Sequence, residues 1–358
     1  MPVPPPPPTS PRLRAPAGAR RRALAVAVLT ATSLTATSLT ACAGPQPAGT
    51  ASAGAVATAD RTAHSAQSAQ SAQETLARRD DLSAATAEAF AALEERFDAR
   101  LGVHALDTGD GTVIEHRADE RFAFASTMKA LAGGLVLDRT GPDGWDEVVR
   151  YGAEDLVTYS PVTELHVDEG MTVLELVRAS ITVSDNTAAN LLLDRLGGPQ
   201  SLEAALHELL SPDGTATVPV SVDRAEPDLN DWAPGSTQDT ATPAAMAAAL
   251  RETALGDALR PEARAALRDA LRDSTTGDAL IRAGVPDGWV VGDKSGAGGH
   301  GTRNDIAVVE RPDAAPLVLA VYSNRRTPDG EADPALVAEA TRVVVDALAG
   351  RALAAPPG

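Results

Sequence analysis

Two lysines stand out among the residues that could do chemistry. Of the 31 Lys and Arg residues in the 358-residue chain, only Lys129 and Lys294 are lysine. A lysine ammonium can lose its proton when it is desolvated, whereas an arginine guanidinium stays charged. Both lysines lie in short polar motifs, Ser126-Thr127-Met128-Lys129 and Lys294-Ser295-Gly296. These two positions are therefore candidates for roles that arginine cannot fill.

Ser126 is the candidate nucleophile. Positions i and i+3 share a face of a helix, so a helix beginning here would bring the Lys129 ammonium beside the Ser126 hydroxyl. A serine needs such a neighbour to attack a carbonyl, and the free N–H groups at the start of a helix suit an oxyanion. Ser-x-x-Lys alone occurs by chance in many proteins, so the function depends on what accompanies it.

Three other motifs accompany it. Ser184-Asp185-Asn186 follows an apolar run over residues 174–183 and, taken alone, is typical of a helix cap or turn. Lys294-Ser295-Gly296 stands at the end of a predicted strand over residues 289–293. The third is Arg-Ala-Glu-Pro-Asp-Leu-Asn at residues 224–230. Pro227 prevents a regular helix there and holds Glu226 on a loop.

Ser-x-x-Lys, Ser-Asp-Asn and Lys-Ser-Gly, in this order, form the signature of class A β-lactamases and penicillin-binding proteins. The sequence resembles a class A serine β-lactamase from about residue 90 to residue 348. Further stretches that read like this family are residues 159–164, 170–173, 184–193, 196–199 and 292–298.

The resemblance implies roles in acylation. Ser126 would attack the lactam carbonyl, and the backbone N–H groups of Ser126 and Ala297 would form the oxyanion hole. Ser184 would pass a proton to the leaving lactam nitrogen. Whether Lys129 or Glu226 is the acylation base stays open.

The resemblance also implies roles in deacylation and binding. Glu226, with Asn230, would hold and activate the water that releases the acyl group. Arg224 and Asp239 would pair across the neck of the loop that carries Glu226, as a structural rather than a catalytic pair. The substrate-binding positions would be Tyr159, Asn186, Lys294, Ser295, Gly296, Ala297 and Arg303. The resemblance implies small-molecule β-lactam substrates and no metal or organic cofactor.

Composition excludes several other functions. The formal charge is −18, which repels phosphate backbones and makes nucleic acid an improbable partner. A single cysteine cannot form an internal disulfide. The six histidines show no spacing typical of metal ligands.

The predicted elements fit an α/β fold with an inserted all-α part. A helix whose apolar residues run from Phe90 to Leu101 is expected to stop at Gly102, and strands follow at residues 103–106 and 112–116. Residues 126–276 are mostly helical in pattern. Strands at 289–293, 305–310 and 317–324 precede a last helix at 334–348. The result is a five-stranded antiparallel sheet flanked by N- and C-terminal helices, with a large inserted helical lobe.

The predicted domain lies at residues 82–352. Its α/β lobe would comprise residues 82–125 and 277–352, and its helical lobe residues 126–276. A cleft between two lobes is where small-molecule sites tend to lie. The default oligomeric state is a monomer.

The first 81 residues predict export. Arg20, Arg21 and Arg22 precede an apolar stretch at residues 23–39 that is too weak for a stable membrane span. Leu39-Thr40-Ala41-Cys42 resembles a lipobox, so residues 1–42 would be an export signal and a lipidated Cys42 would anchor the protein outside the cytoplasm. Ordinary cleavage after Ala43, giving a secreted protein, is the alternative. Residues 43–81, rich in Ala, Ser and Gln, would be a disordered tether.

Two alternative functions share part of the signature. A penicillin-binding D-Ala-D-Ala peptidase would use the same Ser126 and Lys129 but would leave its acyl-enzyme unhydrolysed. A β-lactam sensor would acylate and signal to a partner. Glu226 with Asn230 favours the hydrolase, because a positioned carboxylate can activate water.

Overall fold

The computed structural model of the chain describes residues 82–351 and 353. The predicted export signal, Cys42 and the tether lie outside the described residues. Within the described part, no helix combines the length and the apolar character needed to cross a membrane.

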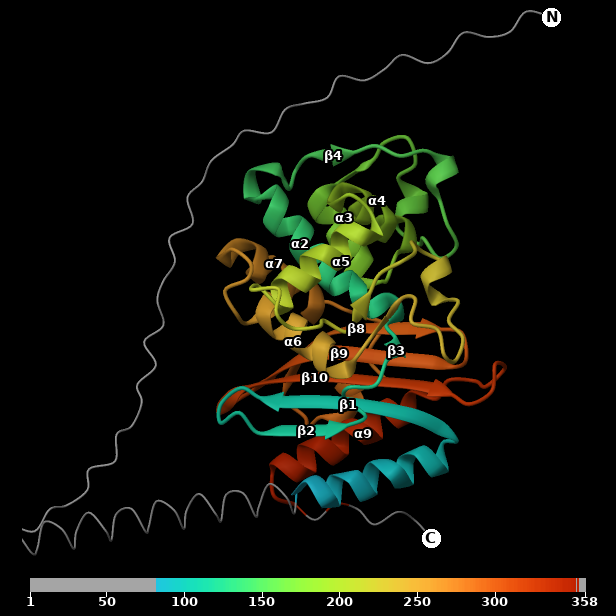
Figure 1. The fold of residues 1–358 in the computed structure, drawn as a ribbon. Coiled ribbons are helices and arrows are strands. Elements are labelled where there is room, and N and C mark those ends of the chain that lie inside the picture. Colours follow the sequence, from blue (N-terminus) through green and yellow to red (C-terminus); the bar gives the residue numbers. More distant parts are fainter. Residues whose placement is uncertain (1–81, 352, 354–358) are drawn as a thin grey trace, which may run out of the picture. The chain divides into compact units, whose positions relative to one another are not determined.

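The centre of the fold is a five-stranded antiparallel sheet in the order β2-β1-β10-β9-β8 (Figure 1). N-terminal strand β1 pairs with C-terminal strand β10, with Val103 opposite Val321. The sheet therefore joins both ends of the described chain, and the predicted fold is confirmed. The strands are β1 Ala99–Asp107, β2 Val113–His116, β8 Val290–Gly298, β9 Thr302–Arg311 and β10 Ala314–Arg325.

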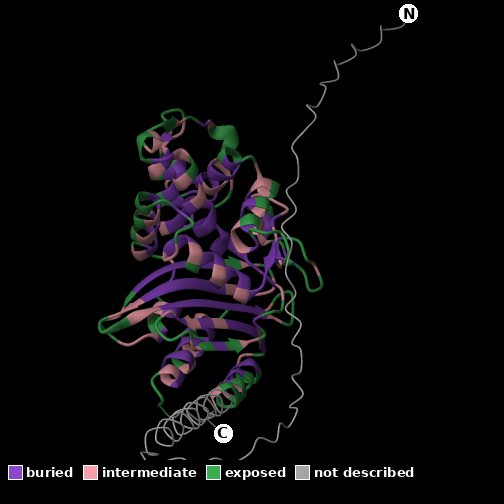
Figure 2. Ribbon diagram, turned by 60° about the vertical axis from the view of Figure 1, so that its left-hand side comes forward, coloured by how far each residue is buried: buried purple, intermediate pink, exposed green. Residues whose placement is uncertain are grey.

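The two faces of the sheet pack against different helices. Along β10, Leu317, Leu319 and Val321 belong to one apolar cluster, and the alternate residues Val318 and Tyr322 belong to another. This alternation follows from the period of two along a strand. The first cluster is covered by a helix that includes residues 82–96 and by α9 Pro334–Leu348, which lie together on one side of the sheet in Figure 1. Figure 2 shows the strands between the two layers as largely buried.

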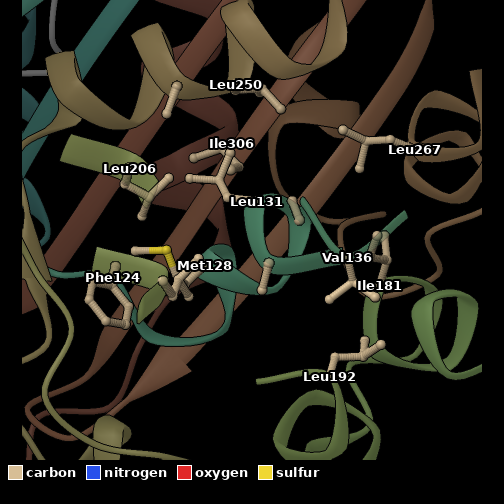
Figure 3. Close-up of a cluster of buried hydrophobic side chains, with 14 of the residues drawn as sticks. Phe124, Met128, Leu131, Val136, Ile181, Leu192, Leu206, Leu250, Leu267 and Ile306 are labelled. Atoms are coloured by element: carbon tan, nitrogen blue, oxygen red, sulfur yellow. The ribbon is translucent and has the colours of Figure 1, made fainter. Parts of the chain in front are cut away.

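The other face carries the helical part. Its helices are α2 Met128–Thr140, α3 Val173–Thr182, α4 Asn186–Leu196, α5 Pro199–Leu210, α6 Pro243–Ala254 and α7 Pro261–Arg272. Figure 3 shows apolar side chains of this part, including Leu131 and Ile181, gathered around α2. A Cβ at Gly133 would lie 3.0 Å from Ile181 Cδ1, and one at Gly134 would lie 3.0 Å from Leu267 Cδ2. Small residues on α2 therefore let its neighbours approach closely.

Several short elements complete the chain. A three-stranded sheet has the order β3-β7-β6, and a two-stranded sheet pairs β4 with β5. Their bounds are β3 Phe122–Ala123, β4 Val148–Val149, β5 Met171–Thr172, β6 Val220–Ser221 and β7 Thr240–Ala241. The short helices are η1 Ala125–Thr127, η2 Pro142–Gly144, η3 Ala153–Asp155, η4 Thr163–Leu165, η5 Asp228–Asn230 and α8 Ile281–Gly284.

The expected end of the first helix was wrong. The helix ends at residue 96, and Leu101 and Gly102 lie in β1. Asp98 adopts a φ of +44°, which breaks the helix. The apolar spacing from Phe90 to Leu101 looks helical because the helix that ends at residue 96 and strand β1 both contribute apolar side chains to the same cluster. Gly102 instead makes room for the Phe122 ring, which would lie 2.4 Å from a Cβ.

The end of the chain follows its prediction closely. α9 spans Pro334–Leu348, and the Asp333 side chain accepts a hydrogen bond of 2.9 Å from Ala335 N as its cap. Strand β8 is longer than expected, because it continues to Gly298. The Lys294-Ser295-Gly296 motif therefore lies inside an edge strand of the sheet rather than after it.

The two-layer packing leads to a stability prediction. Leu319→Ala should lower the free energy of unfolding by about 2–5 kcal/mol, because it leaves a cavity between the sheet and α9. Urea denaturation measures this change. Leu165→Ala is the control, since Leu165 is 72% exposed and its truncation should change stability little. Equal effects of the two substitutions would contradict the assigned packing.

Candidate active site

Ser126 lies at a sharp entry into α2. It belongs to η1, which runs directly into α2, and it is almost buried. The preceding Ala125 has a φ of +48°, an uncommon conformation for a residue with a side chain. Asn304 stabilises this entry, since its Nδ2 donates to Ala123 O at 2.7 Å. Thr127 Oγ1 donates to Phe124 O at 2.7 Å.

Strand β8 passes close to the backbone of Ser126. A Cβ at Gly296 would lie 3.2 Å from Ser126 N and 3.1 Å from Phe124 O. Glycine at this position therefore allows the close approach of the strand. The next residue, Ala297, pairs with Arg303 on β9. The approach brings the backbone of β8 beside the predicted nucleophile.

Lys129 is the centre of a buried polar network. Its Nζ donates to Ser184 O at 2.8 Å and to Asn186 Oδ1 at 2.5 Å, and it lies 3.0 Å from Glu226 Oε1. Ser126 Oγ donates to the same Glu226 oxygen at 3.2 Å. The serine and the lysine thus share Glu226, rather than being joined by a direct hydrogen bond. Burial lowers the pKa of Lys129, and the negative charge of Glu226 acts in the opposite direction.

Ser184-Asp185-Asn186 is both a helix cap and part of this network. Asp185 caps α4 by accepting from Ala188 N at 2.8 Å, and it also accepts from Thr163 N at 2.9 Å. These bonds hold the backbone of Asp185 in place between Ser184 and Asn186. Ser184 has a φ of +63°. Tyr159, 58% exposed, accepts a bond from Asn186 N at its carbonyl oxygen at 2.9 Å.

Lys294 is fully buried and contacts the Ser184 hydroxyl. Its Nζ donates to Ser184 Oγ at 3.1 Å and to Ser295 O at 2.7 Å. Burial, reinforced by repulsion from Lys129, lowers the pKa of Lys294 to about 7. Ser184 therefore lies within hydrogen-bond reach of both lysines of the chain.

Thr276 is a site residue that the sequence did not reveal. Its Oγ1 accepts from Ser295 Oγ at 2.7 Å, and its carbonyl oxygen accepts from Arg303 Nη2 at 3.2 Å. Thr276 thus holds two predicted substrate-binding side chains from neighbouring strands. It has no motif of its own, so only the fold identifies it.

The loop that carries Glu226 is closed by β-pairing at its neck. β6 and β7 are antiparallel, with Val220 opposite Ala241, and β3 pairs with β7 just before Ser126. Arg224 Nε donates to Asp239 Oδ2 at 2.6 Å, and the buried Asp239 also accepts from Arg224 N at 3.0 Å. The predicted pair is therefore present across the neck.

Glu226 is held at both its backbone and its carboxylate. Asn230 Nδ2 donates to Glu226 Oε2 at 2.5 Å. Asn190 accepts from Glu226 N and donates to Glu226 O, both at 2.9 Å. Asn190 was not among the predicted site residues. Its position four residues after Asn186 on the same helix was an available signal, because such residues share a face.

One hydrogen-bonded network brings together six of the predicted site residues, namely Ser126, Lys129, Ser184, Asn186, Glu226 and Lys294. Arg224 and Asp239 lie apart from this network, at the neck of the loop. Among the described residues, no three His, Cys, Asp or Glu side chains come together in a way that could hold a metal ion. The arrangement supplies a serine, a carboxylate shared by that serine and Lys129, two buried lysine side chains, and the Ser184 hydroxyl within hydrogen-bond reach of both lysines. Such a set suits nucleophilic attack on a carbonyl followed by hydrolysis.

Known proteins resemble the chain over most of its length. Residues 85–348 match the model of the β-lactamase enzyme family. A β-lactamase of Bacillus licheniformis is 50% identical over 259 residues, covering 72% of this chain and 82% of that protein. A β-lactamase of Amycolatopsis lactamdurans is 51% identical over 259 residues, covering 72% and 84%. The crystal structure of a class A β-lactamase from Clostridium kluyveri is similar with a TM-score of 0.71 and 40% identity, covering 74% of this chain and 98% of that chain.

The chain therefore belongs to the β-lactamase enzyme family, as a class A serine enzyme. The family match spans the four polar motifs from Ser126 to Gly296, whereas the lipobox-like residues 39–42 lie outside it.

The Arg224–Asp239 pair leads to a prediction about the loop. Asp239→Asn should lower the free energy of unfolding by about 1–3 kcal/mol, since a hydrogen-bonded charge pair with one buried member is lost. Urea denaturation measures the change. Asp273→Asn is the matched control, because the Asp273–Arg178 pair is exposed on both sides and should contribute at most about 1 kcal/mol. If the two variants are equally stable, the pair does not close the loop.

Proposed function

We propose that the protein hydrolyses the amide of penicillin- and cephalosporin-type β-lactams through an acyl-enzyme on Ser126, and thereby confers antibiotic resistance. The observation that carries this proposal is the shared carboxylate. Glu226 Oε1 accepts from Ser126 Oγ at 3.2 Å and lies 3.0 Å from Lys129 Nζ. Asn230 binds the other oxygen of Glu226.

Acylation begins with attack of Ser126 Oγ on the lactam carbonyl carbon. The Oγ–C bond forms, the C–N bond breaks, and the Oγ proton goes to a base. Glu226 is favoured over Lys129 as that base, because it directly accepts the Ser126 hydrogen bond. Ser184 gives its proton to the lactam nitrogen and is reprotonated by Lys129, whose Nζ lies 3.3 Å from Ser184 Oγ. Lys129 in turn takes the proton that Glu226 received from Ser126, across the 3.0 Å between Nζ and Glu226 Oε1, so Glu226 is again a carboxylate when acylation ends.

Substrate binding uses the residues of β8, β9 and the opposite wall. The backbone N–H groups of Ser126 and Ala297 receive the developing oxyanion. The substrate carboxylate is held by Lys294, Ser295 and Arg303, with Gly296 keeping the strand close. Asn186 holds the acylamide side chain, and Tyr159 lines the cleft.

Deacylation depends on a water held between Glu226 and Asn230. Glu226 takes a proton from this water while the water oxygen attacks the ester carbon. The bond from the ester carbon to Ser126 Oγ then breaks, and Glu226 returns the proton to Ser126 Oγ, which restores the free enzyme. A peptidase or sensor would lack such help and would stay acylated. The tight placement of Glu226 by Asn190 and Asn230 favours turnover.

Residues 1–42 direct export, Cys42 is lipidated and anchors the protein to the membrane, and residues 43–81 are a tether. The alternative is secretion after cleavage at Ala43. Residues 82–352 form the enzyme domain, with an α/β lobe (82–125 and 277–352) and a helical lobe (126–276), acting as a monomer.

Glu226→Ala tests the proposed function. Loss of Glu226 should slow deacylation more than acylation, because the strained lactam ring supplies its own driving force and Lys129 remains near Ser126 as a second base. The acyl-enzyme should therefore accumulate, and turnover should fall by about 10²–10⁴-fold, the usual worth of general-base help. A chromogenic cephalosporin should give a burst of one product per enzyme, and intact-protein mass spectrometry should place one adduct on Ser126. Asn230→Ala should slow the same step less. Full turnover in Glu226→Ala, or a wild-type protein that stops after one turnover, would contradict the proposal.

Lys294 leads to a prediction about pH. Its protonated form binds the substrate carboxylate, and its pKa in the free protein is about 7. The value of kcat/KM should therefore fall as pH rises through about 7, mainly because KM rises. Lys294→Arg keeps a charge at every accessible pH, so this alkaline limb should move to higher pH. If the alkaline fall in kcat/KM is unchanged in Lys294→Arg, a group other than Lys294 causes it.

A further inference from the structure

A hollow lies at one end of the central sheet, and its lining includes no residue of the two lysine motifs. It has a volume of about 560 Å³, within the range of small-molecule sites. The residues that line it come from the helix 82–96, the start of β1, the segment 117–121 between β2 and β3, the end of β10 with the residue after it, and the segment 232–237 of the Glu226 loop. Five of them are arginines, namely Arg100, Arg117, Arg121, Arg325 and Arg326.

The charge around this hollow is opposite to that of the protein. The chain carries a formal charge of −18, yet the lining contains five arginines and one acid, Glu94. Two further acids lie beside it, since Glu120 pairs with Arg100 and Arg117 and Asp98 pairs with Arg326, so five arginines stand against three carboxylates. Glu94 is turned inward, with a side chain only 10% exposed. Its oxygens accept from Leu101 N at 2.8 Å and from Arg117 Nε at 2.8 Å. It therefore presents no free carboxylate to a ligand.

Arg121 and Arg325 use only some of their N–H donors in hydrogen bonds to other described residues. Among the described residues, the structure gives the Arg121 side chain hydrogen bonds only to the backbone and hydroxyl oxygens of Thr240. The Arg325 side chain donates from Nε to Glu331 O at 2.7 Å. A guanidinium has five N–H donors, so most of those on Arg121 and Arg325 are left for a ligand.

Arg100 and Arg117 are fixed beside these two. Arg100 donates to Glu120 Oε2 at 2.7 Å, and Arg117 donates to Glu120 Oε1 at 3.1 Å. Their positions are therefore preorganised, which lowers the entropy that a ligand must overcome.

We propose that this hollow binds a phosphate-type anion, either a free pyrophosphate-sized molecule or the phosphate of a lipid headgroup. Arg121 and Arg325 supply forked donors that match tetrahedral phosphate oxygens. The local positive potential attracts the anion in spite of the acidic remainder of the surface.

Ligand binding at this position would also order part of the Glu226 loop. Trp232 lines the hollow, and its ring meets that of His300 at 5.7 Å in an edge-on contact. Gly299 N donates to Asn230 O at 2.9 Å. An anion that joins the strand ends to residues 232–237 therefore restrains the segment that follows Asn230.

Isothermal titration of the full chain with pyrophosphate tests the proposal, with sodium chloride at equal ionic strength as the blank. The variant pair is Arg121→Gln/Arg325→Gln. The matched control is Arg150→Gln/Arg178→Gln, which removes the same charge at exposed positions outside the hollow. A second arm measures co-sedimentation with phosphatidylglycerol vesicles and with phosphatidylcholine vesicles. Thermal unfolding without ligand checks that both double variants are folded.

The expected result is saturable binding of one pyrophosphate, weakened at least about tenfold in Arg121→Gln/Arg325→Gln and unchanged in the control. Pyrophosphate should also slow amide hydrogen exchange at residues 232–237. Binding to phosphatidylglycerol vesicles alone, with the same dependence on Arg121 and Arg325, would support the site and identify the headgroup as its source. The absence of saturable binding in both arms, or equal loss in both double variants, would overturn the proposal.

Discussion

The close approach of the Lys129 ammonium and the Glu226 carboxylate is the constraint on which the rest of the structure depends. Both side chains are almost completely buried, and their atoms lie 3.0 Å apart. Removing two charges from water costs several kcal/mol for each ion, so such a pair persists only if further hydrogen bonds satisfy both partners. Those bonds come to Lys129 from the Ser184–Asn186 segment and to Glu226 from Asn230. The start of α2, the segment that caps α4 and the Glu226 loop are therefore held in fixed positions relative to one another.

Backbone strain gathers around the same point. Ala125, Tyr159 and Ser184 all have positive φ values, although none is glycine. Such conformations cost of order 1–3 kcal/mol each and persist only where the surroundings over-determine them. Here the surroundings are the Asp185 cap and the Asn304 bond to the backbone before Ser126. All three residues adjoin the site: Ala125 precedes Ser126, the Ser184 hydroxyl accepts from Lys129, and the Tyr159 carbonyl oxygen accepts from Asn186 N.

Much of this arrangement could be predicted because the informative residues are local in sequence. The rarity of lysine drew attention to Lys129 and Lys294, and Asp333 with Pro334 fixed the start of α9. Asn190 and Thr276 were missed because their roles depend on which segments the fold brings together. The end of the first helix was misplaced because apolar spacing cannot distinguish one helix from a helix and a strand that share a core. The left-handed turn at Asp98, which separates them, has no strong sequence signal.

The placement of the lysines has a practical consequence for covalent labelling. Reagents that acylate primary amines normally modify many surface lysines and attach a protein to a support in many orientations. Here both lysines of the chain are buried in one cleft, with Lys129 4% exposed and Lys294 0% exposed. The surface of the described residues therefore offers arginines, which such reagents leave intact. Amine-reactive reagents should modify the described part of the chain little, because both of its lysine side chains are buried.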